Sequence, residues 1–234
     1  MAPTQGDNDD ARSIIDRRST AYSSALTLIE MLVNGMDISL AESSDRIQLS
    51  GFLFDMNVFF QAFISRFLRE ELPEFSIQDE RRLKEIFEYN RANNPQRRRA
   101  VVPRPDFAVT VGGKVIEFLD AKYRDLWETK LPRDVLYQLA IYALSKNNGV
   151  PRSTILYPTL AVDAIEQIVL LKDPIFGHKR AKIILRPVNL LEMEGLIRPR
   201  RGAVVARKRR EFAHSLAFGN YPAAQFRTLS SLAS

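Results

Sequence analysis

The chain lacks several residue types and patterns on which common functional sites depend. It contains no cysteine, which excludes disulfides and thiolate metal sites. Its only histidines, His178 and His214, lie far apart in the sequence, so a cluster of histidine metal ligands is not expected. The sequence has no G-x-x-x-x-G-K-[ST] phosphate loop, no G-x-S-x-G elbow and no dinucleotide-binding glycine pattern. Any nucleotide-driven motion must therefore come from a partner.

Long apolar runs are also missing, so we expect no membrane span. The first ten residues are polar and acidic and lack the basic-then-apolar order of a secretion signal. The absent signal and the absent cysteine favour a cytoplasmic location.

The composition is that of one ordinary globular domain with a basic surface. The chain has 234 residues, of which 45% are hydrophobic, and its formal net charge is +6. Two basic clusters stand out, and both suit DNA phosphates: Arg97, Arg98 and Arg99, and a second group that includes Arg198, Arg200, Arg201, Arg207, Lys208, Arg209 and Arg210. A solvated surface is the alternative interpretation of both clusters.

The pattern of apolar residues predicts an α/β protein. We expect helices over residues 14–33, from the N-cap Asp55 to Pro73, and from Pro132 to before Gly149, with a helical or mixed segment at 76–92. Two short strands joined by Gly112-Gly113, at residues 107–111 and 114–119, predict a β-hairpin. Further strands are predicted at residues 46–49, 153–157, 166–171 and 182–188, with a helical turn at 189–196. The segment after Arg198 shows no clear pattern.

The predicted hairpin carries the strongest candidate site. Alternation along its second strand predicts that Ile116, Phe118, Asp120 and Lys122 share one face and that Glu117 points to the other. Asp106 precedes the first strand, and its position depends on the register. A strict two-residue turn places Asp106 opposite Leu119, whereas a longer loop or a bulge places it opposite Asp120. The second register, or a bend at Pro105, is required to bring both carboxylates to one cation.

The residue types at this site suit metal-assisted hydrolysis. Mg²⁺ prefers oxygen ligands and keeps several waters, so Asp106 and Asp120 are candidate metal ligands, with Mn²⁺ as a possible substitute. A cation held there lowers the pKa of bound water and neutralises phosphate charge. Lys122 adds a positive charge that can orient water or stabilise an oxyanion. The alternative is a hairpin with charged residues at its solvent-exposed end.

The segment Arg104-Pro105-Asp106, followed by Asp120-Ala121-Lys122-Tyr123, resembles the core of the PD-(D/E)XK nucleases. Within that class the chain is most similar to McrC, the nuclease subunit of McrBC modification-dependent restriction systems. The stretches at residues 52–57 and 137–143 resemble that family's first nuclease helix and the helix after the metal motif.

This resemblance implies a restriction-endonuclease-like fold, with a mixed sheet flanked by helices. It implies an N-terminal region over residues 1–45, a nuclease core over 46–197 and a basic C-terminal segment over 198–234. The implied function is Mg²⁺-dependent DNA cleavage in defence against foreign or modified DNA, with an McrB-like AAA+ GTPase as motor partner. Gln138 and Tyr142, spaced by four on one helix face, are implied supporting residues.

The chain departs from the McrC pattern in two respects. Relatives often carry glutamate in the first nuclease helix where this chain has Gln61, a neutral amide that supports a metal only weakly. Only about fifty residues precede that helix, which fits a shortened relative, a fragment or a subunit that docks differently. Two rival functions stay open: a nuclease-fold adaptor that regulates or assembles with a GTPase, and a simple DNA-binding module.

Overall fold

A computed structural model describes residues 55–146, 151–198 and 202–219 of the chain. The helix predicted at residues 14–33 and the strand predicted at 46–49 lie outside these residues. Within them, no helix combines the length and the apolar character needed to cross a membrane.

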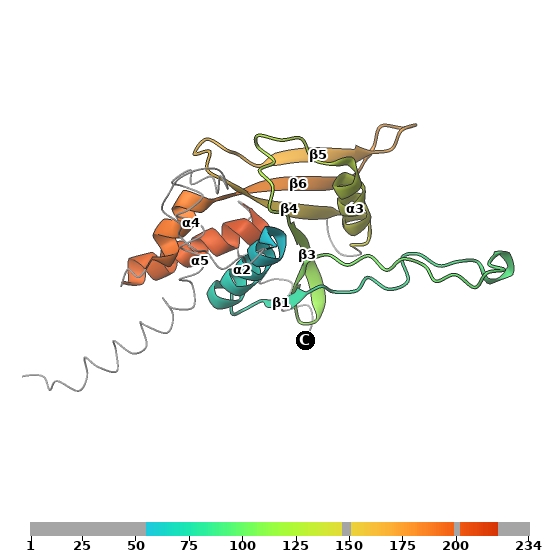
Figure 1. Cartoon of the computed structure of the whole chain (residues 1–234), viewed down its shortest axis with the longest axis horizontal. Coiled ribbons are helices and arrows are strands. Elements are labelled where there is room, and N and C mark those ends of the chain that lie inside the picture. The colour runs from blue at the N-terminus through green and yellow to red at the C-terminus, as the bar shows by residue number, and fades with distance from the viewer. Residues whose placement is uncertain (1–54, 147–150, 199–201, 220–234) are drawn as a thin grey trace, which may run out of the picture.

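One mixed sheet of six strands forms the centre of the molecule, in the order β1-β2-β3-β4-β6-β5 (Figure 1). Strands β3, β4 and β6 are parallel neighbours, and the other pairings are antiparallel. The bounds are β1 Ser76–Asp79, β2 Phe107–Val111, β3 Lys114–Ala121, β4 Arg152–Thr159, β5 Gln167–Lys172 and β6 Lys179–Asn189. The predicted mixed α/β fold is confirmed.

Helices cover both faces of this sheet. Helices α2 (Met56–Glu71), α4 (Leu190–Ile197) and α5 (Ala203–Phe218) share one apolar core with one face of the sheet. Helix α3 (Arg133–Leu144) packs on the other face and forms a second core there. Layers on both faces bury the apolar surface that an uncovered sheet would expose.

Helix α5 packs against the rest of the fold, although it lies in the segment predicted as a basic C-terminal extension. Its C-terminal half contributes Ala213, Leu216, Ala217 and Phe218 to the core that it shares with α2, and all four are buried. The basic run at its N-terminal half hid this apolar stripe from the sequence pattern. The segment is therefore a structural layer of the same domain.

Residues 80–106 form an extended arm, so the helical alternative for the helical or mixed segment predicted over 76–92 is wrong. Ser76–Asp79 is a strand, and from Glu80 the chain runs out from the body, turns through the 3₁₀-helix Arg91–Asn93 and returns to β2 (Figure 1). Glu80 and Glu85 have φ values of 50° and 70°, which a right-handed helix cannot contain. No side chain between residues 80 and 104 is buried, so no apolar face was available to hold a helix on the sheet.

Candidate active site at the end of the hairpin

A β-bulge sets the register of the hairpin. Gly112 and Gly113 form a two-residue turn with φ values of 54° and 78°, a conformation that favours glycine. Val111 pairs with Lys114 and Thr110 with Val115, but Val109 pairs with Glu117, so Ile116 is the extra residue of β3. The bulge shifts all later pairs and places Phe107 opposite Leu119. Continuing this register brings Asp106 opposite Asp120, as the nuclease interpretation required.

The same bulge corrects the predicted faces of β3. Ile116 packs in the core with α2 and α5, whereas Phe118 packs in the core with α3. The two residues therefore do not share a face, because the extra residue interrupts the alternation between them. Glu117 contacts Arg152 and Lys146 and takes no part in the acid pair.

The two aspartates form a closely coupled pair. Asp106 Oδ2 accepts a hydrogen bond of 2.8 Å from the backbone N–H of Ala121, the residue after Asp120. Burial raises the pKa of Asp106 to about 6. Burial and the neighbouring Asp106 charge raise the pKa of Asp120 to about 7. Lys122 lowers the pKa of both groups, so its positive charge acts on the whole pair.

Helix α3 brings a tyrosine hydroxyl to the acid pair. Tyr142 is buried, and its hydroxyl accepts a hydrogen bond from Gln138 Nε2, one turn earlier on the helix. Burial raises the pKa of Tyr142 to about 12, with further contributions from the charges of Asp120 and Asp106. The structure thus brings both predicted supporting residues of this helix to the site.

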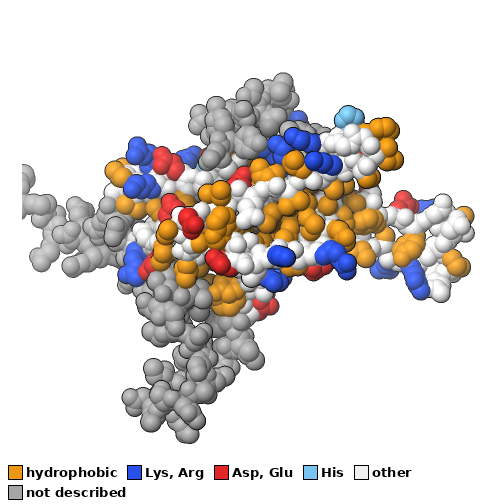
Figure 2. All heavy atoms as spheres, turned by 90° about the horizontal axis from the view of Figure 1, so that it is seen from above, with side chains coloured by type: hydrophobic (Ala, Val, Ile, Leu, Met, Phe, Trp, Pro, Cys, Tyr) orange, Lys and Arg blue, Asp and Glu red, His pale blue; other side chains and the backbone are white. Residues whose placement is uncertain are grey.

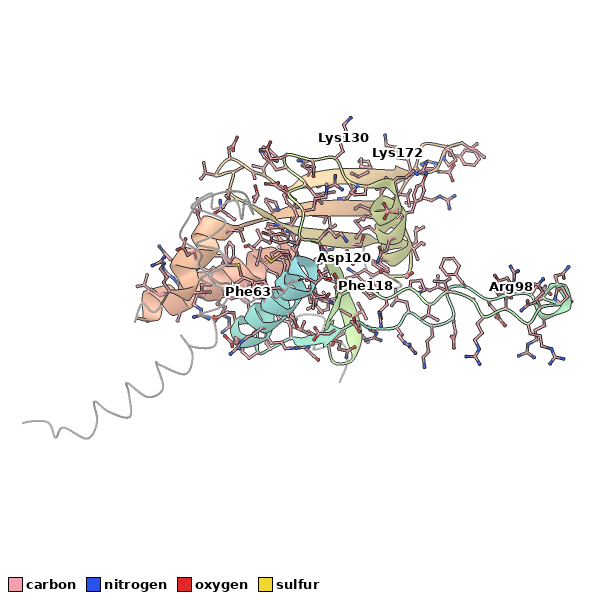
Figure 3. All side chains as sticks on the ribbon, in the orientation of Figure 1. Phe63, Arg98, Phe118, Asp120, Lys130 and Lys172 are labelled. Atoms are coloured by element: carbon pink, nitrogen blue, oxygen red, sulfur yellow. The ribbon has the colours of Figure 1, made fainter. Side chains whose placement is uncertain are left out.

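The N-terminal end of helix α2 lies beside the end of strand β3. Asp55 caps the helix as predicted, since its side chain accepts from the backbone N–H groups of Asn57 and Val58. Asn57 Oδ1 accepts a hydrogen bond of 3.2 Å from the backbone N–H of Tyr123, just past β3. Figure 3 shows Asp120 beside this end of α2. Gln61 lies one turn beyond Asn57 and is half-buried, with no side-chain hydrogen bond among the described residues.

Two carboxylates are what this site offers a metal ion. Across the described ranges, no group of three or more His, Cys, Asp or Glu side chains is arranged to hold a metal. A pair of buried carboxylates that repel each other nonetheless fits a hard divalent cation, because the cation would remove the repulsion and complete its shell with water. Gln61, where the sequence resemblance leads us to expect a glutamate, adds no third carboxylate.

The two predicted basic clusters differ in their surroundings. Arg97, Arg98 and Arg99 are exposed at the end of the arm, where Figure 3 labels Arg98, and no carboxylate of the described residues pairs with them. In the other cluster, Arg209 forms ion pairs with Glu71 at 2.7 Å and Glu70 at 3.6 Å.

Three further members of this cluster lie on α5, whereas Arg200 and Arg201 lie outside the described residues. Arg210 pairs with Glu74 at 2.8 Å, and Arg207 approaches Glu211 at 3.5 Å, while Lys208 is exposed. Arg209 and Arg210 thus join α5 to α2 and the loop after it, which the sequence did not predict. Sequence reasoning also missed the arm, whose turn is marked by Asn90, Asn94 and Pro95.

The fold and the site together define a class of protein. Its members are mixed α/β proteins with two interacting carboxylates and a lysine at the end of a β-hairpin. The family described as "McrBC 5-methylcytosine restriction system component" matches residues 2–158, about two thirds of the chain. The chain therefore belongs to the McrBC family, which confirms the resemblance seen in the sequence.

Among solved structures, the chain is similar to one in the refined half-complex from the tetradecameric assembly of Thermococcus gammatolerans McrB AAA+ hexamers with bound McrC. The identity is 22% and the TM-score 0.40, over 71% of this chain and 34% of that chain. This chain thus spans about one third of the length of that neighbour. No curated protein matches the chain.

Proposed function

We propose that the protein is a metal-dependent DNA endonuclease of the PD-(D/E)XK class, similar to McrC, that acts on foreign or modified DNA. The observation that carries this proposal is the bulge at Ile116, which turns Asp106 and Asp120 into one coupled pair. Perturbed pKa values that arise from burial and a like charge are typical of functional sites.

Each residue of the site has a defined part in this proposal. Asp106 and Asp120 would hold Mg²⁺, with Mn²⁺ as a substitute, and a bound metal supplies activated water and neutralises phosphate charge. Lys122 lies close enough to lower the pKa of both carboxylates, where its ammonium group would orient water or stabilise the oxyanion that develops on the phosphate. The hydrogen bond from Gln138 to the Tyr142 hydroxyl would hold that hydroxyl in place near Asp106 and Asp120.

We further propose that the protein works with an McrB-like AAA+ GTPase in the cytoplasm. This part rests on membership of a family whose description names a restriction-system component. The chain itself carries no phosphate loop, so GTP hydrolysis would be the partner's contribution.

A plasmid-nicking assay tests the nuclease proposal. Wild-type protein should convert supercoiled DNA to nicked or linear forms with Mg²⁺ or Mn²⁺, and EDTA should stop the reaction. Asp120→Ala and Lys122→Ala should each remove the activity, whereas Asp163→Asn, which changes an exposed carboxylate of the loop after β4, should not. Equal cleavage by wild type and both site variants would contradict the proposal.

One observation favours a second candidate, a nuclease-fold adaptor that regulates or assembles with a GTPase. Gln61 leaves the described site with two carboxylates where a third would strengthen metal binding. The adaptor predicts that wild-type protein cuts no DNA under any metal, while Gln61→Glu gains activity or metal affinity.

A further inference from the structure

The arm, residues 80–106, begins and ends at the candidate active site. Its first leg leaves β1 at Asp79, which pairs with Phe107 of β2, and its second leg ends at Asp106. The backbone N–H of Glu80 donates to the carbonyl of Asp106 at 2.9 Å, and that of Leu83 donates to the carbonyl of Pro103 at 2.9 Å. Anything that contacts the arm near its base therefore also lies beside the acid pair.

Most of the net charge of the protein lies on this arm. Residues 80–106 contain eight Arg and Lys against three Glu and Asp106, a net charge of +4, out of a formal +6 for the whole chain. Arg104 and Glu80 pair with each other at the base, at 3.3 Å, whereas Arg97, Arg98 and Arg99 are exposed near the far end. A concentrated positive field beside a hydrolytic site suits a polyanionic ligand.

Asparagine side chains build a defined turn at the end of the arm. Asn90 caps the 3₁₀-helix by accepting from the N–H of Ala92. Asn94 both donates to the carbonyl of Arg98 and accepts from its N–H, each at 2.9 Å. Arg97 adopts a φ of 51°, a conformation that costs free energy in a residue other than glycine. These contacts fix the backbone that presents the three arginines.

The arm has no core of its own. Phe87, Tyr89, Val101 and Val102 are exposed, and Figure 2 shows the arm as a projection at the right, away from the body. Leu83, near the base, packs against the core beneath α3, but the outer part of the arm makes no such contact. A binding partner is therefore the simplest reason for the shape of the outer part.

We propose that the arm lies along the phosphate backbone of duplex DNA on one side of the scissile bond, with Arg97, Arg98 and Arg99 on phosphates far from the cut. This inference rests on the proposed nuclease function. From Leu83 to Asn94 the chain spans eleven residues, which reach at most about 36 Å when extended. At about 3.4 Å per base pair, the tip contacts DNA up to roughly ten base pairs from the acid pair.

Binding measurements test the arm without relying on cleavage. We would use Asp120→Asn protein in EDTA and duplexes of about 12 and about 30 base pairs, and compare two triple variants. Arg97→Gln/Arg98→Gln/Arg99→Gln should weaken binding to the long duplex by about 10- to 100-fold near 0.1 M salt and reduce its salt slope by about 2 to 3. The loss on the short duplex should be smaller, because a duplex of about 12 base pairs centred on the acid pair extends only about six base pairs to each side and ends before the tip.

The matched control removes three exposed lysines away from the arm. Lys130→Gln/Lys172→Gln/Lys179→Gln takes away the same charge, and Figure 3 shows Lys130 and Lys172 near the β5 edge. This variant should bind both duplexes within about three-fold of the parent. Equal losses of DNA binding in both triple variants would overturn the proposal. An arm variant that binds the long duplex as tightly as its parent would also overturn it, even if that variant no longer binds a protein partner.

The absence of cysteine allows a second, positional test. Ala92→Cys provides a unique attachment point for a DNA-cleaving chelate at the tip, and Thr129→Cys provides a control on the loop before α3. Chelate at residue 92 should cut at one side of the bound site, up to about ten base pairs from the cut made by the enzyme itself. Cutting at or across the enzyme's own site would overturn the placement. If the enzyme makes no cut but the arm variant still loses long-duplex binding, the nuclease proposal falls and the DNA contact stands.

Discussion

Strand β3 carries two buried carboxylates, three residues apart, in opposite electrostatic surroundings. Glu117 is 1% exposed and forms ion pairs with Arg152 and with Lys146, the latter at 3.4 Å. Asp120 is 7% exposed, and among neighbouring charges the largest effect on its pKa comes from another carboxylate, Asp106. Burial raises the pKa of both groups, but two cations oppose this effect at Glu117, whereas at Asp120 a like charge adds to it.

This difference separates a structural charge from a functional one. Glu117 is neutralised within the fold, so it needs no ligand, and it joins β3 to β4 and to the end of α3. The acid pair is balanced only in part by Lys122, and its repulsion stays until protons or a cation arrive. Burial alone does not identify an active-site carboxylate, and the sign of the nearest charges decides between the two roles.

The largest expected effect is the loss of cleavage when the acid pair is broken. Asp120→Asn should reduce metal-dependent DNA cleavage by more than about 100-fold, since even outer-shell partners of metal ligands are worth 10- to 100-fold. Glu117→Gln, the same chemical change three residues earlier, should keep most of the activity of the folded protein. Plasmid nicking at matched concentrations of folded protein measures both, and equal losses would remove the distinction between the two sites.

The second effect concerns stability, where substitution of Glu117 should cost more than substitution of Asp120. Glu117→Ala leaves Arg152 and Lys146 buried without their carboxylate, and breaking such a buried pair typically costs about 3–5 kcal/mol of unfolding free energy. Asp120→Ala should cost far less, because it also removes a repulsion. Urea unfolding followed by circular dichroism checks this, and a Glu117→Ala variant as stable as wild type would show that the ion pairs are dispensable.

The sequence predicted the elements of this comparison better than their arrangement. Alternation, the glycine turn and the flanking proline predicted the hairpin and its three ionisable residues, because local chain chemistry decides them. The sequence suggested that a bulge was possible but did not locate it at Ile116. Its position depends on how β2 and β3 pack against two different cores. The role of Glu117 was out of reach because Arg152 is 35 residues away along the chain. The arm was not predicted, and residues 76–92 were left as a helical or mixed segment, because their charged residues resemble a solvated helical face.

The third effect is a pH dependence of stability that belongs to the acid pair. Asp106 and Asp120 have pKa values raised to about 6 and about 7 in the folded protein, above the ordinary value of 3.8. Between about pH 4 and pH 7 the folded state thus binds more protons than the unfolded state, so stability without metal falls as pH rises. Asp120→Asn should be more stable than wild type at pH 7.5, on the order of 2 kcal/mol, and the difference should vanish near pH 4.

Urea unfolding in EDTA at several pH values measures this difference. Mg²⁺ should reduce it, since a cation bound only to the folded wild type adds about 1.4 kcal/mol when its concentration is ten times the dissociation constant. Glu117→Gln serves as the control, since it leaves the acid pair intact and should keep the pH-dependent gap to Asp120→Asn. Parallel stability curves for wild type and Asp120→Asn would show that the two aspartates are not coupled.

The smallest and sharpest effect is expected at Gln61. Gln61→Glu would add a carboxylate to helix α2, as a possible third acid beside Asp106 and Asp120. The N-terminal end of this helix contacts the end of β3 through the hydrogen bond between Asn57 and Tyr123. An added negative charge near the site should tighten Mg²⁺ binding by a few-fold, up to about 10-fold, and lower the metal concentration needed for cleavage. Without metal it should destabilise the protein at pH 7.5, because it extends the repulsion that already exists between Asp106 and Asp120.

Gln167→Glu on the exposed edge strand β5 makes the same charge change away from the site and should neither tighten Mg²⁺ binding nor destabilise the protein. Isothermal titration with Mn²⁺ measures the affinity. Unchanged affinity in Gln61→Glu would show that α2 does not contribute to the metal site, and the contrast on β3 would then rest on the two aspartates alone.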